Sequence, residues 1–259
     1  MATEPNVNQV LAEIEKLEEF INRSEFWPAA RFYRSNVLLA LISKALTVGR
    51  AVCELVEAGF PGEAFGLSRT LVEIFFNVRY ISNKETEDRA KRYVGYFTKT
   101  HESWMTIIQR YYPEKQSMPM PDFHEHAMEM AKQYKSPHNW TGLGGQVKEM
   151  ALEEDTYEVD SKGEPVKQIF DYEVIYWWTS QFVHGTILSL AGHEMEPGGV
   201  FRIRGRMEAE RGRTTDALSN VLIFLSKIFI CACRGMQADQ PEELLSEITQ
   251  LVSSFTKTK

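Results

Sequence analysis

The chain has 259 residues, of which 43% are hydrophobic and 12% aromatic; this composition excludes a disordered chain and allows a sizeable core. Its formal net charge of -7 provides no overall attraction for nucleic acid or an anionic membrane, so either partner would need a local basic patch. The three cysteines, Cys53, Cys231 and Cys233, have no spacing typical of a disulfide framework or a zinc site. We therefore expect reduced thiols in a cytoplasmic protein.

Helical periodicity dominates the N-terminal part of the chain. Apolar residues at helical spacing predict a first helix over 6–23, which we expect to form an arm of the domain. A second helix is expected over 28–58, with a proline in its first turn. Gly59 should end it as a left-handed cap before Pro61 restarts the chain. The short link predicts an antiparallel hairpin with a third helix over 63–82.

The remaining elements are also mostly helical. Further helices are expected over 86–111, 122–134, 168–191, 216–236 and from Pro241 to about Phe255. Loops near 112–121 and 154–167 resemble insertions in one helical array, because no parallel-strand pattern lies beside them. Alternating residues near 200–213 could pair as one small hairpin. We therefore predict an all-α, antiparallel multi-helix array of about seven to nine helices, forming a single domain over 1–259.

The most apolar run, 217–233, raises the question of a membrane. It is shorter than the roughly 20 apolar residues that a membrane span usually needs, and it contains Asn220 and Lys227. We interpret it as a buried core helix. The first 20 residues carry acidic side chains and do not look like a signal peptide, so we expect no membrane association and a cytoplasmic location.

Two charged residues lie on an aromatic stripe of the predicted third helix. Arg69 and Glu73 are one turn apart and share this stripe with Phe65, Phe76 and Tyr80. Burying such a pair is costly unless it is well hydrogen-bonded. The two residues are therefore a satisfied core ion pair, the floor of a polar pocket, or ordinary surface residues, and the sequence leaves these alternatives open.

A second polar group lies in the predicted helix 168–191. Ser180 and His184 are one turn apart, so the hydroxyl can reach the imidazole, and Tyr176 and Trp177 lie beside them. Histidine can shuttle protons near neutral pH. A nucleophilic serine, however, usually occupies a strained turn beside an oxyanion hole, and no Gly-x-Ser-x-Gly motif is present. A satisfied core histidine and a catalytic or binding histidine are both compatible with this pattern.

An arginine-rich stretch covers 202–213. Arg202, Arg204 and Arg206 alternate, so in an extended strand their guanidinium groups would align on one side. Guanidinium suits phosphate or carboxylate. The plainer alternative is a solvated loop that pairs with acidic faces of the chain.

Metal and cofactor motifs are weak in this sequence. His124, His126 and Glu129 would need a loop to bind one ion together, and no His-Glu-x-x-His motif is present. The glycine-rich stretch 142–145 follows no predicted strand, and no Walker-type loop occurs. We therefore expect neither a metal nor a cofactor.

Three short motifs resemble those of an uncharacterised bacterial all-helical family, catalogued as a domain of unknown function. They are the run from Gly62 to Glu73, then Trp140-Thr141-Gly142 followed by Met150-Ala151, and Tyr176 to Ser180 with His184. The resemblance spans about 40–190, most of the chain. It implies an α-helical fold and carries no assigned activity.

A more distant analogy is to HEPN-type helical ribonucleases. These proteins place an arginine a few residues before a histidine on one helix, usually across a dimer. This sequence departs from the pattern, because Ser180 stands where the arginine would be useful and no arginine closely precedes His184. Arg69, on a neighbouring helix, would have to supply the charge.

Two hypotheses of different class follow. In the first, the chain is a phosphate- or nucleic-acid-directed hydrolase, with His184 as general acid/base beside Ser180, Arg69 stabilising charge and Glu73 orienting Arg69. Its RNA or phosphorylated ligand would be bound by Trp140, Tyr176, Trp177, Arg202, Arg204 and Arg206. In the second, the chain is a non-enzymatic binding or assembly module, such as a homo-oligomer, and the buried Arg-Glu-His cluster is structural. The sequence leaves open whether the protein is an enzyme.

Overall fold

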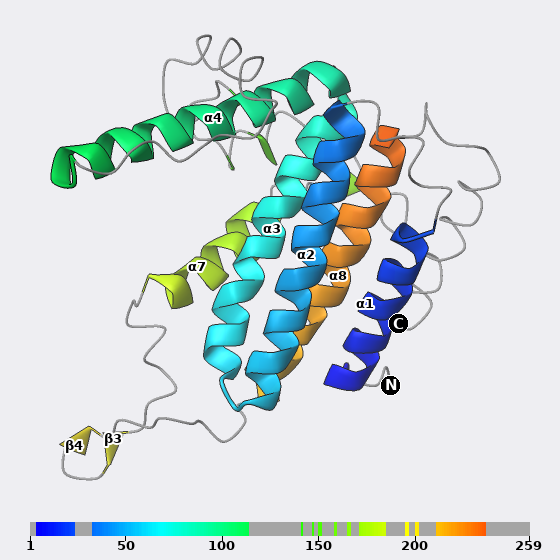
Figure 1. Cartoon of the computed structure of the whole chain (residues 1–259). Helices are drawn as coiled ribbons and strands as arrows, with labels where there is room; N and C mark the ends of the chain where they lie inside the picture. The colour runs from blue at the N-terminus through cyan, green and yellow to red at the C-terminus, as the bar shows by residue number, and fades with distance from the viewer. Residues whose placement is uncertain are drawn as a thin grey trace.

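The protein is mainly helical. The computed structural model describes residues 4–23, 33–113, 141, 147, 150–151, 158–159, 165–166, 171–184, 195–196, 200–201 and 211–236. Its helices are α1 (Val7–Ile21), α2 (Tyr33–Glu57), α3 (Pro61–Asn83), α4 (Thr86–Tyr111), the π-helix η2 (Asp171–Tyr176), α7 (Trp177–Val183) and α8 (Arg211–Met236) (Figure 1). The predicted all-α class is confirmed.

Two short antiparallel hairpins accompany the helices. In the first, β1 (Glu158–Val159) pairs with β2 (Pro165–Val166). In the second, β3 (Met195–Glu196) pairs with β4 (Val200–Phe201). The second hairpin begins at Met195, before the predicted 200–213. Residues 202–210 lie outside the described part of the chain.

Helix α1 begins at a capping box. The Asn6 side chain accepts a hydrogen bond from the backbone N–H of Gln9 at 3.0 Å, and the Gln9 side chain accepts one from the backbone N–H of Asn6 at 3.1 Å. These bonds satisfy two amide groups that a helix start leaves unpaired. The apolar face of α1 is buried through Val10, Ile14, Leu17 and Phe20. The predicted helix over 6–23 is therefore confirmed, and it packs against α2 and α8.

The hairpin between α2 and α3 forms as the sequence predicts. Gly59 has a φ of 83°, the left-handed conformation that glycine adopts without steric cost. The N–H of Phe60 then bonds the carbonyl of Leu55 at 2.8 Å, which closes the end of α2. Pro61 is the first residue of α3, where its missing N–H costs nothing.

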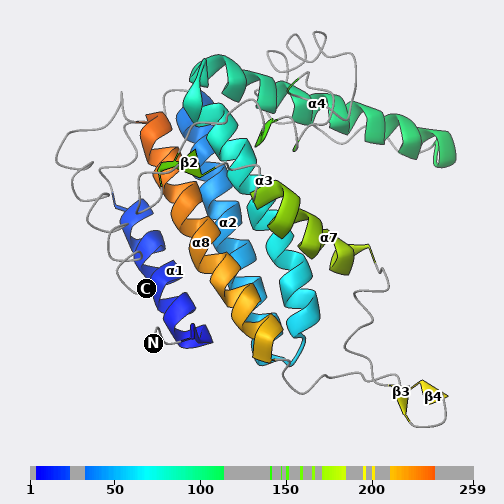
Figure 2. The same cartoon turned by 180° about the vertical axis from the view of Figure 1, so that it is seen from behind.

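Helices α2, α3 and α8 lie side by side and form the centre of the molecule (Figures 1 and 2). Four phenylalanine side chains are among the largest that are fully buried in this core: Phe75, Phe76, Phe224 and Phe229. Helix α2 is antiparallel to α3, whereas α3 and α8 run parallel. Gly62 lies beside Arg213 near the start of both helices, and Ser82 lies beside Gly235 near their ends.

A glycine allows the bundle to pack closely at its middle. A Cβ at Gly49 of α2 would lie 3.1 Å from Ile14 Cδ1 of α1 and 3.2 Å from Val221 Cγ1 of α8. Both distances are tighter than ordinary van der Waals contact. Three helices therefore meet at this position because the side chain is a single hydrogen.

Two expected helices differ in their bounds. The helix expected over 168–191 is the π-helix η2 followed by α7, which ends at Val183. Helix α8 begins at Arg211 rather than at 216, so the helix takes in the end of the arginine-rich stretch. Arg213 therefore belongs to the first turns of α8 and not to a loop. The expected helices at 122–134 and after Pro241, and the start of the second helix at 28–32, lie outside the described residues.

Two described helices are long and apolar enough to cross a membrane. They are Tyr33–Glu57 and Gly212–Met236, and 56% of the most apolar stretch of each is buried inside the structure. The central helices of soluble proteins have the same length and composition, and α8 is buried against α2 and α3 as a core helix would be. The absence of membrane association and the cytoplasmic location stay predictions.

The three cysteines all lie in the described part of the chain and form no disulfide. Cys53 and Cys233 are buried in the bundle and Cys231 is half-buried. Burial raises the pKa of Cys53 to about 11 and raises that of Cys233 as well, because a thiolate is unfavourable in an apolar environment. Both buried residues therefore behave as apolar core side chains near neutral pH.

Candidate functional site

The aromatic stripe predicted on α3 faces the core, and its two charged members lie at the margin of that core. Phe65, Phe76 and Tyr80 are buried. Arg69 and Glu73 form an ion pair along the helix, with Nη2 and Oε1 2.8 Å apart and side-chain exposures of 19% and 36%. The pair is thus neither fully buried nor on the open surface.

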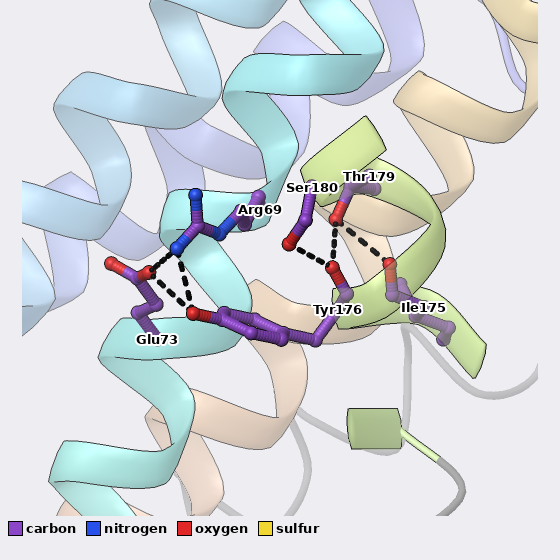
Figure 3. A network of polar contacts seen from close by, with 6 residues as sticks. All are labelled: Arg69, Glu73, Ile175, Tyr176, Thr179 and Ser180. Carbon is purple, nitrogen blue, oxygen red and sulfur yellow. Dashed lines mark hydrogen bonds and ion pairs between the residues drawn. The ribbon is translucent and has the colours of Figure 1, made fainter. Parts of the chain in front are cut away.

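Tyr176, the last residue of η2, completes this pair from the neighbouring element (Figure 3). Its hydroxyl accepts a hydrogen bond from Arg69 Nη2 at 2.6 Å and donates one to Glu73 Oε1 at 3.2 Å. The Arg69 guanidinium also lies 4.6 Å from the centre of the Tyr176 ring. The three side chains form a polar cluster between α3 and η2, which we call the Arg69 cluster.

The Tyr176 phenol is protonated near neutral pH. Burial raises its pKa above 10.0, and Glu73 raises it further, while the hydrogen bond and charge of Arg69 act in the opposite direction. A protonated phenol can donate to Glu73 while accepting from Arg69. The protonation state therefore agrees with the geometry of the cluster.

The hydroxyl of Ser180 bonds the backbone of its own helix. Its Oγ donates to the Tyr176 carbonyl at 2.5 Å, and the neighbouring Thr179 donates in the same way to the Ile175 carbonyl at 2.8 Å (Figure 3). Both acceptors lie at the junction of η2 and α7, where the change of helix type alters the regular backbone bonding. Within the described residues, Ser180 makes no hydrogen bond to the His184 side chain, although the sequence places that side chain within reach.

His184 ends helix α7. Its backbone N–H donates to the Ser180 carbonyl at 3.0 Å, and its side chain is exposed. The structure thus brings Arg69, Glu73 and Tyr176 together, with Ser180 one turn further along. The His184 side chain makes no polar contact with Arg69 or Glu73 within the part of the chain that the structure describes.

A second polar contact holds the other end of η2. Lys227 Nζ of α8 lies 2.6 Å from Oδ2 of Asp171, the first residue of the π-helix. The ammonium group also lies 5.4 Å from the centre of the Phe75 ring and 5.6 Å from that of Phe224. Sequence reasoning missed this pair. The lysine inside the apolar run 217–233 was its one visible signal, since a charge there needs a partner.

Helix α7 packs on the first half of α3. The Phe182 ring lies edge-on to Phe65, with ring centres 5.2 Å apart. A Cβ at Gly66 would lie 3.3 Å from Phe182 Cβ, so the glycine permits this close approach. On the other side, the Arg213 guanidinium lies 4.7 Å from the Phe182 ring centre. The structure therefore places this member of the arginine-rich stretch beside α7.

The outer side of η2 and α7 carries exposed apolar residues. Val174, Trp177 and Trp178 are 46%, 52% and 43% exposed. We call these three residues the tryptophan surface. Trp177 was predicted as a ligand contact, and its exposure leaves it accessible to one.

Several predicted site residues lie outside the described part of the chain. These are Trp140, Arg202, Arg204 and Arg206, together with the histidine-rich cluster at 124–129. Within the described residues, no group of three or more His, Cys, Asp or Glu side chains could hold a metal ion.

Comparison with known proteins identifies a family. The model described as "Family of unknown function (DUF5677)" matches residues 35–199, which include most of α2 and all of α3, α4, η2 and α7. No curated protein and no solved structure matches the chain. The matched range contains both elements that build the Arg69 cluster.

Proposed function

The chain belongs to this family of unknown function, and we propose that it is a non-enzymatic helical binding module. In this proposal the Arg69 cluster is structural, and the tryptophan surface is where a partner docks. The carrying observation is that Arg69 Nη2, Glu73 Oε1 and the Tyr176 hydroxyl bond one another, while the apolar side chains beside them are exposed.

The hydrogen bonding within the cluster supports a structural role. The Nη2 group of Arg69 bonds both Glu73 and Tyr176, and the Ser180 hydroxyl bonds a backbone carbonyl. A hydrolase would need these groups directed at a substrate or at His184. Through Nη2 alone, Arg69 already joins α3 to η2, although its buried Nε has no hydrogen-bond partner among the described residues.

The tryptophan surface supports a docking role. Tryptophan is enriched at the centres of protein interfaces, where burial of its large ring contributes much of the binding free energy. The last η2 residue, Tyr176, joins the Arg69 cluster, and Trp177 follows it directly. The cluster therefore holds in place the segment that presents the surface.

The hydrolase hypothesis is the second candidate, and the surroundings of His184 favour it. The exposed His184 lies two residues after Phe182, on whose ring the Arg213 guanidinium stacks. An imidazole for proton transfer and a guanidinium for phosphate charge would suit an RNA or another phosphorylated ligand. In this alternative His184 is the general acid/base and Arg69 holds α7 in position.

A cleavage and stability experiment separates the two candidates. Single-stranded RNA would be incubated with the purified wild type and with His184→Ala, Arg69→Met and His101→Ala, each first shown to be folded by circular dichroism. His101, on α4, is the control histidine. The binding module predicts no cleavage by any protein, a lower Tm for Arg69→Met, and an unchanged Tm for His184→Ala.

The opposite result would support the hydrolase. Cleavage by the wild type and by His101→Ala that is lost in folded His184→Ala would overturn the binding-module proposal. Equal loss of Tm in His184→Ala and Arg69→Met would show that His184 belongs to the structural cluster in solution.

A further inference from the structure

A second exposed apolar stripe lies on α4. Trp104, Ile107 and Tyr111 recur at i, i+3 and i+7, so they share one side of the helix, and they are 50%, 52% and 71% exposed. We call them the α4 stripe. The described surface thus has two groups of exposed large apolar side chains, the α4 stripe and the tryptophan surface. Contiguous apolar patches of this kind commonly mark interaction sites.

The α4 stripe lies on the second half of α4, and the first half of this helix is attached to the bundle. Near the start of α4, the Glu87 carboxylate accepts hydrogen bonds from the backbone N–H groups of Tyr33 and Arg34, each at 3.2 Å, at the N-terminus of α2. Arg89 and Ala90 are buried against the bundle. The second half of α4 projects away from α2, α3 and α8 in both views (Figures 1 and 2).

We propose that the occupant of both apolar surfaces is a second copy of this chain. The α4 stripe of one protomer packs on the tryptophan surface of its partner, and the reciprocal contact forms on the other side of a two-fold axis. This arrangement covers both surfaces at once, as expected for a closed two-fold dimer. It rests on the binding role proposed above and names the partner.

The charges beside the two surfaces are complementary. Arg110 is exposed next to the α4 stripe, and Glu173 is exposed next to the tryptophan surface. Neither side chain forms an ion pair with the described residues. Docking of the stripe on the tryptophan surface brings the guanidinium toward the carboxylate, which favours this pairing over contact between two copies of the same surface.

The dimensions also agree. Trp104 and Tyr111 are seven residues apart, so the stripe is about 10 Å long at 1.5 Å per residue. The tryptophan surface, from Val174 to Trp178, extends over little more than one helical turn. One amphipathic helix lying across a short helix is a common mode of recognition, in which a few apolar anchors supply most of the affinity.

The test measures the mass of the full-length protein across a range of concentrations by sedimentation velocity. The wild type is expected to form a dimer. Trp104→Glu and Trp177→Glu should each raise the dimer dissociation constant at least about tenfold, because a carboxylate would replace a buried ring. Ile223→Glu is the matched control, since Ile223 is an exposed apolar residue of α8 outside both surfaces.

A charge exchange tests the pairing without removing an aromatic ring. Arg110→Glu and Glu173→Arg should each weaken the dimer by up to about fivefold, and the double variant should recover toward the wild type. Recovery requires that the two side chains meet in the dimer. Losses that add in the double variant would overturn the proposed contact.

Three other outcomes would overturn the proposal. One is a monomer at all concentrations, and another is a dimer that persists in both folded tryptophan variants. The third is a monomer that binds phosphatidylserine vesicles through Trp177, which would make lipid the occupant. Failure of the dimer proposal is distinct from failure of the proposed binding function. The dimer is tested by the mass of the protein, whereas the binding function would be overturned by His184-dependent RNA cleavage.

Discussion

The bundle of α2, α3 and α8 and the segment formed by η2 and α7 are held in different ways. The bundle buries four phenylalanine side chains almost completely, together with a continuous set of aliphatic residues. The segment is attached through the Arg69 cluster, through the Asp171–Lys227 pair and through Phe182 on α3. Apolar burial is distributed over many residues, whereas polar attachment depends on a few atoms. We therefore expect the segment to open locally at a lower free energy than the bundle.

The largest expected effect comes from emptying the bundle core. Phe224→Ala should lower the free energy of unfolding by about 3–5 kcal/mol, because it removes a fully buried ring and leaves a cavity. Ile223→Ala, on the same helix but 38% exposed, is the control and should cost far less. Urea denaturation measures both. Similar losses of unfolding free energy in the two variants would contradict the burial of Phe224 and the exposure of Ile223.

The next effect tests packing at the end of the bundle. A Cβ at Gly235 would lie 2.6 Å from Ser82 Oγ and 2.8 Å from Ser82 Cβ, so Gly235→Ala should destabilise by about 1–3 kcal/mol. Gly212→Ala, where a Cβ meets nothing within 4 Å, should be neutral or stabilising because alanine favours the helix. Equal thermal shifts in both variants would show that α3 and α8 are not in close contact there.

Removal of the Asp171–Lys227 pair should loosen the segment more than the bundle. Asp171→Asn is expected to cost about 1–2 kcal/mol, since it leaves the Lys227 ammonium without its charged partner near two aromatic rings. Hydrogen exchange should increase over 171–184 and remain unchanged in the middle of α2. When Lys227 is already replaced by methionine, Asp171→Asn should lower the free energy of unfolding by a smaller amount. Additive losses would show that the two side chains do not interact.

Breaking the Arg69 cluster should have a smaller effect. Tyr176→Phe removes the hydroxyl that joins Arg69 and Glu73 and should cost about 1 kcal/mol, again with faster hydrogen exchange in η2 and α7. Tyr172→Phe is the matched control. The Tyr172 ring stacks on Tyr176 with ring centres 5.1 Å apart, but its hydroxyl makes no hydrogen bond to the described residues. Equal effects would assign the stabilisation to ring packing instead.

The smallest effect appears at high pH. Burial raises the pKa of Tyr176 in the folded protein above that of an unfolded tyrosine, so the folded state retains its phenolic proton where the unfolded chain loses it. This contribution is present below pH 10 and is lost as the pH rises through the folded-state pKa. The pKa of Tyr93 is also raised by burial, so the wild type and Tyr176→Phe should both lose stability. The wild type should lose more unfolding free energy than Tyr176→Phe as the pH rises. Equal losses in the two proteins, measured by denaturation at increasing pH, would contradict this.

Much of the helical framework was predictable, because its signals are local. The capped helix α1, the Gly59 hairpin and the limits of α4 all follow from periodicity, capping and turn residues. The ion pair between Arg69 and Glu73 also follows from their spacing of one helical turn. The parallel course of α3 and α8 did not follow, because a long connection constrains helix direction less than a short one.

The amino-acid sequence by itself determined that the chain is helical, where α4 begins and ends, and that Arg69 and Glu73 share one side of α3. The tertiary structure decided that Tyr176, and not His184, joins this pair, and that Lys227 in the apolar run pairs with Asp171. It also decided that six residues before Trp177 form a π-helix. Periodicity predicts which residues share one helix face, whereas contacts between distant segments depend on how whole helices pack.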